Sequence, residues 1–218
     1  MTLIKITRSF VLPKWVNMGK DTKNIILAAA KEVFTKKGFA GARMQEIADQ
    51  AGINKGLLHY YFKSKNALFN AVFFEIFDAV SPELNDILSA KDTDVLTKIG
   101  QFVDRYMEVL LKNPFFISHV VCELNRDPNR LVSSMLKGGK IPNPVPFLVQ
   151  LQQEAQEGKI KETDPFQLMI SIVSLCAFPF VGRPVMELIL DMETQDFLEL
   201  MERRKDWIKQ FVQDGLRP

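Results

Sequence analysis

The chain has 218 residues, of which 47% are hydrophobic and 25% are charged, as in typical soluble globular proteins. These proportions exclude collagen-like and disordered chains, and the length suits one large domain or two small ones. The two cysteines, Cys122 and Cys176, are too few for a disulfide framework and lack zinc-site spacing, which favours a reducing, intracellular setting.

The net charge of +2 conceals an uneven distribution along the chain. Residues 1–65 hold 12 Lys or Arg and 4 Asp or Glu, a net charge of +8, and the remainder carries −6. A basic N-terminal segment on an acidic remainder suggests that this segment binds a polyanion such as nucleic acid. A basic surface that is merely solvated has the same composition, so charge alone leaves both alternatives open.

Residues 1–19 form an N-terminal extension before the first helical pattern. Lys5, Arg8 and Pro13 interrupt the continuous apolar stretch that a signal peptide needs. Met18 is a second possible start, so the extension is either a basic arm or a start-site artefact.

Three helices are predicted over residues 20–66. The first begins at Thr22, with Asp21 or Thr22 as its cap, and ends at Gly38. Two short helices follow at about 44–51 and 54–60, and Ser64 is placed to cap a long helix from Lys65. The apolar positions that recur at steps of three and four in the first helix are Ile26, Ala29, Ala30, Val33 and Phe34.

Residues 44–62 have the pattern of a helix-turn-helix. Two short helices that cross at roughly 90–120° need a small residue where they approach and a glycine in the turn, and Ala48 and Gly52 supply these. The expected inward residues are Ile47, Ala51, Ile53, Leu58 and Tyr61, and the expected outward ones are Gln45, Asp49, Asn54, Lys55, Leu57 and Tyr60. The second helix would thus present a polar, basic end to a DNA major groove, although a plain helical corner shares these features.

The remainder of the chain, residues 67–218, also shows helical patterns and no alternation typical of strands. The predicted breaks are Ser81-Pro82, Asn113-Pro114, Asp127-Pro128, residues 138–146, Gly158 and Asp164-Pro165. The longest apolar run, near residues 175–181, is far short of the roughly 20 residues of a membrane helix. We therefore predict an all-α protein with a three-helix head and a larger helical body, without a membrane segment and located in the cytoplasm.

Residues 22–74 resemble the N-terminal domain of TetR-type transcriptional regulators. The matching motifs are Ile26-Leu27-x-Ala29-Ala30, Phe34-x-x-x-Gly38-Phe39, Ile47-Ala48-x-x-Ala51-Gly52-Ile53-x-Lys55-Gly56, Tyr60-Tyr61-Phe62-Lys63-x-Lys65 and Leu68. The resemblance implies binding of double-stranded DNA through Arg43, Gln45, Asn54, Lys55, Gly56, Leu57, His59, Tyr60 and Lys65. Lys65 would hold a phosphate at the start of the fourth helix.

Three positions depart from the family's pattern, which often has Thr or Ser at Ala42, Arg43 and Leu57. Arg43 is suited to a guanine edge or to a phosphate, and Leu57 to a thymine methyl group. The operator sequence therefore does not carry over from the family.

The resemblance also implies a homodimer, formed by the last two long helices at about 164–181 and 195–213, and a small-molecule effector bound in the body. Apolar surface on these helices fits a subunit interface, and an ordinary core is the alternative. Flexible and aromatic side chains that suit an apolar pocket are Phe73, Phe77, Phe102, Tyr106, Met107, Phe115, Phe116, His119, Met135, Phe147 and Phe178, with core packing again the alternative. Tyr106 and His119 are the expected polar contacts.

Enzymatic function has little support. His119, Cys122 and Glu123 share a helix face at i, i+3 and i+4, but no second cluster completes a metal site. Phosphate-loop, dinucleotide-binding and nucleophile-elbow motifs are absent from the sequence. We expect no metal, no cofactor and no catalysis. The predicted function is a ligand-responsive repressor that binds a palindromic operator as a dimer and is released by a small apolar ligand; the alternative is a helical protein–protein interaction module with a basic head.

Overall fold

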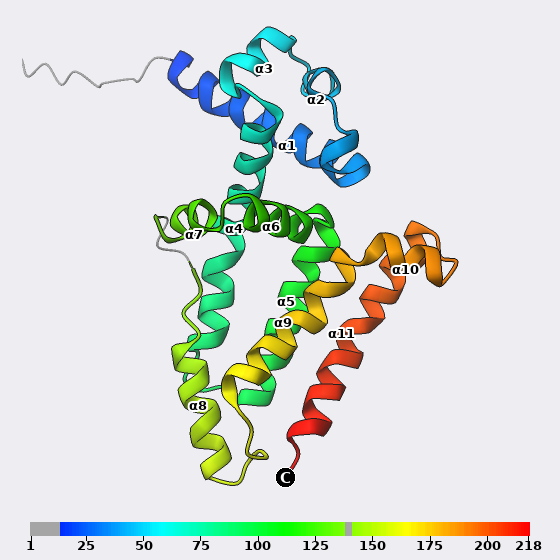
Figure 1. Ribbon diagram of the computed structural model, residues 1–218. Coiled ribbons are helices and arrows are strands. Elements are labelled where there is room, and N and C mark those ends of the chain that lie inside the picture. The colour runs from blue at the N-terminus through cyan, green and yellow to red at the C-terminus, as the bar shows by residue number, and fades with distance from the viewer. Residues whose placement is uncertain (1–13, 138–140) are drawn as a thin grey trace, which may run out of the picture. The chain divides into compact units, whose positions relative to one another are not determined.

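The computed structural model describes residues 14–137 and 141–218, and every regular element in these ranges is an α-helix (Figure 1). The all-α prediction is confirmed. The helices of the described ranges are α1 (Lys14–Gly41), α2 (Met44–Gln50), α3 (Lys55–Tyr61), α4 (Lys65–Ser89), α5 (Val95–Lys112), α6 (Phe115–Arg126), α7 (Pro128–Lys137), α8 (Val145–Gln156), α9 (Pro165–Val181), α10 (Arg183–Ile189) and α11 (Thr194–Leu216). Residues 1–13 of the predicted N-terminal extension lie outside the described residues.

The chain divides after Val72 into two compact units, here called the N-terminal unit and the C-terminal unit. The sequence had placed this boundary after Asn66. Because residues 66–72 contain no charged side chain, the division leaves the charge asymmetry intact. The N-terminal unit carries +8 and the C-terminal unit −6.

Helix α1 begins earlier than predicted. It starts at Lys14 and runs through Asp21 and Thr22, so the expected cap at these residues is wrong. Residues 14–21 contain no proline, and the helical hydrogen bonds therefore continue without interruption. The predicted end at Gly38 is confirmed as a kink, where φ is +64°, a value that glycine adopts without steric cost.

Helix α4 continues through Ser81-Pro82, where the sequence predicted a break. Proline removes one backbone hydrogen bond from a helix, but Phe73, Leu84 and Leu88, on both sides of Pro82, are buried. Burial of a continuous apolar face outweighs the lost bond. The other predicted breaks do separate helices.

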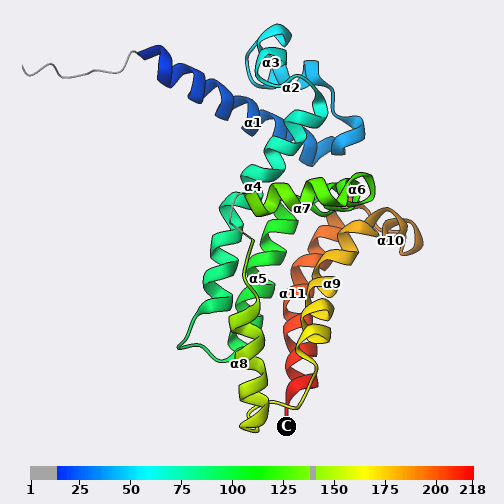
Figure 2. The same cartoon turned by 60° about the vertical axis from the view of Figure 1, so that its left-hand side comes forward.

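Helix α5 is the centre of the C-terminal unit. It packs against α8, α9 and α11 (Figures 1 and 2), and Val103, Met107 and Leu110 on its inner face are fully buried. The sequence did not predict the short helix α10, which lies between α9 and α11 along the chain. In the residues that the structure describes, no single helix is long and apolar enough to cross a membrane. Helices α9 and α10 reach the length and apolar composition of a membrane span only when they are counted together, and they are bent by 68° relative to each other.

Candidate nucleic-acid interface and ligand cavity

The turn between α2 and α3 has the geometry that a helix-turn-helix needs. Gly52 has a φ of +67°, and the backbone N–H of Ile53 donates to the carbonyl of Ala48 at 3.0 Å. Ile47, Ala48 and Leu58 are fully buried where the two helices meet. The predicted ranges of both helices are confirmed to within one residue at each end.

Asn54 caps α3, a role that the sequence analysis had not assigned to it. Its side-chain Oδ1 accepts a hydrogen bond from the N–H of Leu57 at 2.8 Å, which satisfies a donor left free at the helix start. A Cβ atom on Gly56 would stand 3.2 Å from this same Oδ1. Glycine at position 56 therefore leaves room for the cap.

Most of the predicted DNA contacts are accessible. The exposed residues among them are Arg43, Gln45, Asn54, Lys55, Gly56, Leu57, His59 and Tyr60. Tyr60 has 72% of its surface exposed, and the Nζ of Lys63 lies 5.7 Å from its ring centroid. Arg43 directly precedes α2, and its guanidinium, which only donates hydrogen bonds, cannot cap the free N–H groups at the helix start.

Lys65 is the exception, because its ammonium group is bonded inside the N-terminal unit. Its Nζ donates to the carbonyl oxygens of Phe39 at 2.8 Å, Ala42 at 3.0 Å and Ala40 at 3.4 Å. It also lies 4.5 Å from the centroid of the Phe39 ring. An ammonium has three protons to donate, and all three are directed at the end of α1. We therefore leave Lys65 out of the proposed phosphate contacts.

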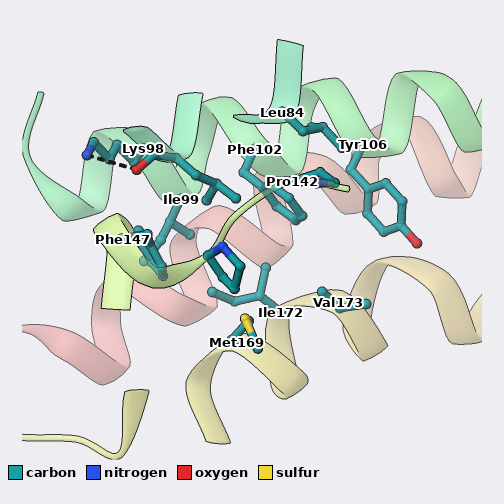
Figure 3. A pocket seen from close by; sticks show the side chains of 12 residues that line it. Leu84, Lys98, Ile99, Phe102, Tyr106, Pro142, Phe147, Met169, Ile172 and Val173 are labelled. Carbon is teal, nitrogen blue, oxygen red and sulfur yellow. Dashed lines mark hydrogen bonds between the residues drawn. The ribbon is translucent and has the colours of Figure 1, made fainter. Parts of the chain in front are cut away.

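The C-terminal unit contains a cavity of about 280 Å³ between α4, α5, α8 and α9 (Figure 3). Its lining residues are Leu84, Leu88, Lys98, Ile99, Phe102, Tyr106, Pro142, Pro144, Phe147, Met169, Ile172 and Val173. Ten of these twelve have purely apolar side chains, and Lys98 and Tyr106 are the exceptions.

Only some of the predicted pocket residues line this cavity: Phe102, Tyr106 and Phe147 do. Met107 and Phe115 are buried, Met135 is half-buried, and Phe178 is 62% exposed; none of these four lines it. The aliphatic and proline walls were missed because the prediction selected aromatic, Met and His side chains. Nothing local in the sequence distinguishes a Leu or Ile that faces a cavity from one in a filled core.

Another group of predicted pocket residues forms an aromatic cluster outside the cavity lining. The centroid of the Phe73 ring lies 4.7 Å from that of Phe116, 4.9 Å from that of His119 and 6.1 Å from that of Phe77. Burial lowers the pKa of His119, and the nearby charge of Glu123 opposes this effect.

Glu123 forms an ion pair with Arg130. Among the described residues, no group of three or more His, Cys, Asp or Glu side chains is arranged to hold a metal ion. His119, Cys122 and Glu123 therefore do not form a metal site in the described part of the chain.

A buried polar network surrounds the cavity-lining residue Lys98, which is 2% exposed. The Nζ of Lys98 donates to Gln150 Oε1 at 2.5 Å and to the Leu88 carbonyl at 3.3 Å. Gln150 Nε2 donates in turn to Glu154 Oε1 at 2.7 Å, and the Glu154 carboxylate accepts from the N–H of Val95 at 3.2 Å. Burial lowers the pKa of Lys98, and the nearby charge of Glu154 opposes this.

Exposed apolar side chains follow the outer faces of α9 and α11. On α9 they include Phe166 and Ile170, at i and i+4. On α11 the rings of Trp207 and Phe211, each more than half exposed, stack at 5.0 Å. The two helices lie side by side in both views (Figures 1 and 2).

A family model described as "Bacterial regulatory proteins, tetR family" matches residues 26–72. The chain is 48% identical to the HTH-type transcriptional regulator RutR of Escherichia coli (strain K12) over 56 residues, which is 26% of each chain. Both comparisons identify a TetR-type DNA-binding segment in this chain. The segment that matches this curated relative spans about a quarter of its length, and the residues matched by the family model include α2 and α3.

Solved structures extend the TetR likeness to the fold of the whole chain. A TetR transcription regulator from Haloarcula marismortui aligns with a TM-score of 0.61 and 17% identity, over 91% of this chain and 100% of that one. The transcriptional regulator FadR from Bacillus subtilis, in complex with stearoyl-CoA, aligns with a TM-score of 0.59 and 20% identity, over 88% and 98% of the two chains. Both likenesses concern the fold alone.

Proposed function

We propose that this chain is a TetR-family, DNA-binding transcriptional repressor that acts in the cytoplasm as a homodimer and is released from its operator by a small ligand. The observation that carries the proposal is the exposure of eight expected contact residues on and around α2 and α3. They belong to a unit with a net charge of +8, which suits a polyanionic partner.

DNA binding would place the N-terminal end of α3 in a major groove. Lys55 supplies positive charge there, and Leu57, which is 36% exposed, supplies an apolar contact for a thymine methyl group. The Asn54 Oδ1 is already used by the cap, so its amide N–H groups are the part that faces the DNA. Arg43 contributes either a base contact or a phosphate contact from the start of α2.

The dimer would form along the exposed apolar faces of α9 and α11. A two-fold pair of chains presents two α3 helices to half-sites about 34–36 Å apart, or a multiple of that distance, on a palindromic operator. Exposed apolar patches of this kind on a globular protein commonly mark interaction sites.

The ligand would bind in the cavity of the C-terminal unit. Its size and apolar walls match those of small-molecule sites, and the structurally similar FadR was solved with stearoyl-CoA. Such a ligand changes DNA affinity only by the difference between its affinities for the DNA-binding conformation and the released one.

Selection of genomic DNA fragments on the purified full-length chain, followed by footprinting of the retained DNA, tests the proposal. A short palindrome with one protected half-site per subunit is expected. Lys55→Met should weaken retention, and Lys161→Met, which removes the same charge from an exposed site in the C-terminal unit, should not. Salt-independent binding, or no binding to duplex DNA, would instead favour a protein–protein interaction module.

A further inference from the structure

We infer that Asp49 is a positioning residue for base recognition, because it holds the side-chain amide of Gln45 in an orientation that matches adenine. The inference rests on the proposed function, since it assigns the chemistry by which α2 would read an operator. It makes adenine, rather than guanine or a phosphate, the partner of Gln45.

Gln45 and Asp49 lie one helical turn apart on the surface of α2. The Nε2 of Gln45 donates to the Oδ1 of Asp49 at 2.8 Å, and both residues are exposed. Carboxylate oxygens only accept hydrogen bonds, so the amide has to meet Asp49 with its NH₂ group and not with its oxygen. The bond therefore fixes which way round the amide lies.

The bond to Asp49 also decides which groups of Gln45 are left for DNA. A primary amide has two N–H donors and one carbonyl acceptor. Since one donor is bonded to Asp49, one donor and the Oε1 acceptor remain. In the major groove adenine presents the complementary pair, an N6 amino donor beside the N7 acceptor, and a glutamine side chain can bind both.

Guanine and phosphate match the remaining groups less well. The major-groove edge of guanine has two acceptors, N7 and O6, which would require both N–H groups of the amide. Phosphate oxygens also act as acceptors, so the Gln45 Oε1 would stay without a partner there. A free glutamine amide could turn both of its donors to either partner, whereas an amide bound to Asp49 has only one donor to offer.

The negative charge of Asp49 is not explained by helix stability. Asp49 is in the last turn of α2, where the helix dipole disfavours a negative charge. Glu46 on the same helix forms an ion pair with Lys37 at 2.5 Å, but in the described part of the chain Asp49 has no such ion pair and bonds to Gln45 instead. An acid at this surface also repels DNA phosphates. The orientation of Gln45 is the contribution that offsets both effects.

Two substitutions separate the hydrogen bond of Asp49 from its charge. Asp49→Asn and Asp49→Ala both remove the negative charge, but an asparagine oxygen can still accept from the Gln45 amide and alanine cannot. Any effect of the charge on DNA affinity is therefore common to both variants. A difference between them measures the orientation of Gln45.

Selection from a randomised duplex DNA library on the full-length chain, followed by affinity measurements on single-base changes, tests the inference. With the unchanged protein we expect adenine at one position of each half-site. Gln45→Ala should lower discrimination at that position roughly 5- to 140-fold, as for the loss of a bidentate pair. Asp49→Ala should lower it about 2- to 12-fold, the range for a side chain that is no longer held in place, and Asp49→Asn should preserve it.

Gln50→Ala is the matched control. Gln50 is the other glutamine of α2, and its Nε2 donates to Glu32 of α1 at 2.9 Å. This variant loses a glutamine with the same kind of bond at the next turn of the helix, and it should leave every base preference unchanged.

A base other than adenine at the position that depends on Gln45 would overturn the inference. Equal losses of discrimination in Asp49→Asn and Asp49→Ala, or no loss in either, would overturn it as well. A uniform loss of affinity for all sequences in Gln45→Ala would make Gln45 a phosphate contact. Each of these results would leave the DNA-binding proposal intact, whereas failure of the unchanged protein to retain any duplex DNA would refute both.

Discussion

Replacement of Lys65 by methionine separates a structural role for this residue from a phosphate contact. The Lys65 ammonium donates to three carbonyls at the end of α1, and hydrogen bonds to a charged group contribute about 1.5–3 kcal/mol. The residue is half-buried, so water replaces part of what is lost. We expect Lys65→Met to lower the local free energy of unfolding of the N-terminal unit by about 2 kcal/mol.

Hydrogen exchange of the backbone amides of α2 and α3 in the full-length chain measures this loss. A change of about 2 kcal/mol corresponds to a roughly 30-fold fall in protection. The slope of log affinity against log salt for DNA should stay the same, because no phosphate contact has been removed. Lys55→Met is the matched variant, and it should reduce that slope by about 0.9 with little effect on exchange.

The reverse pattern would refute this reasoning. If Lys65→Met left amide protection unchanged and lowered the salt slope by about one, the ammonium would be free to leave the α1 carbonyls for a phosphate. The role first expected from the sequence would then be correct.

Three further changes test other parts of the structure. Asn54→Ala should cost about 1 kcal/mol of α3 stability through loss of the cap, whereas Asn54→Asp should keep the cap yet weaken DNA binding through its negative charge; equal stability of all three proteins in urea would contradict the cap. Phe211→Glu should give a monomer in sedimentation velocity and Gln210→Glu, one residue away and exposed, should not; dimers of both variants would exclude this face of α11 as the interface. Above pH 9 the free energy of unfolding should fall by up to about 1.4 kcal/mol per pH unit, because the unfolded thiol of Cys176 ionises near pH 9 while burial raises the pKa of the folded one to about 12. Cys176→Ala should lack this decline between pH 9 and pH 10. If urea titrations of that variant showed the same decline, another titrating group would be its cause.

Features with a local cause were predictable from the sequence. The ranges of α2 and α3 follow from apolar spacing around Ala48 and from the positive φ that Gly52 adopts. The start of α4 follows from Ser64, whose Oγ accepts a hydrogen bond from the N–H of Ala67 at 3.1 Å. These interactions join residues three or four positions apart, so the sequence pattern contains them.

Features that depend on the path of the chain were not predictable. The partners of Lys65 lie more than twenty residues away at the end of α1, and Gln150 is more than fifty residues from Lys98. In the sequence analysis, Lys65 was assigned to a DNA phosphate and Lys98 was not singled out. The helix break predicted at Pro82 was wrong, because the local tendency of proline to end a helix is outweighed by the burial of apolar side chains on both sides of it.

The opposite charges of the two units affect how the protein would encounter DNA. Phosphates attract the unit of net charge +8 and repel the unit of net charge −6, so the field favours approaches in which α3 leads. This orientation raises the rate of productive encounters at low salt and fades once the Debye length drops to about 8 Å at physiological ionic strength. The near-neutral sum of +2 also limits self-repulsion, so the proposed dimer would form without the long-range penalty that a uniformly basic protein would face.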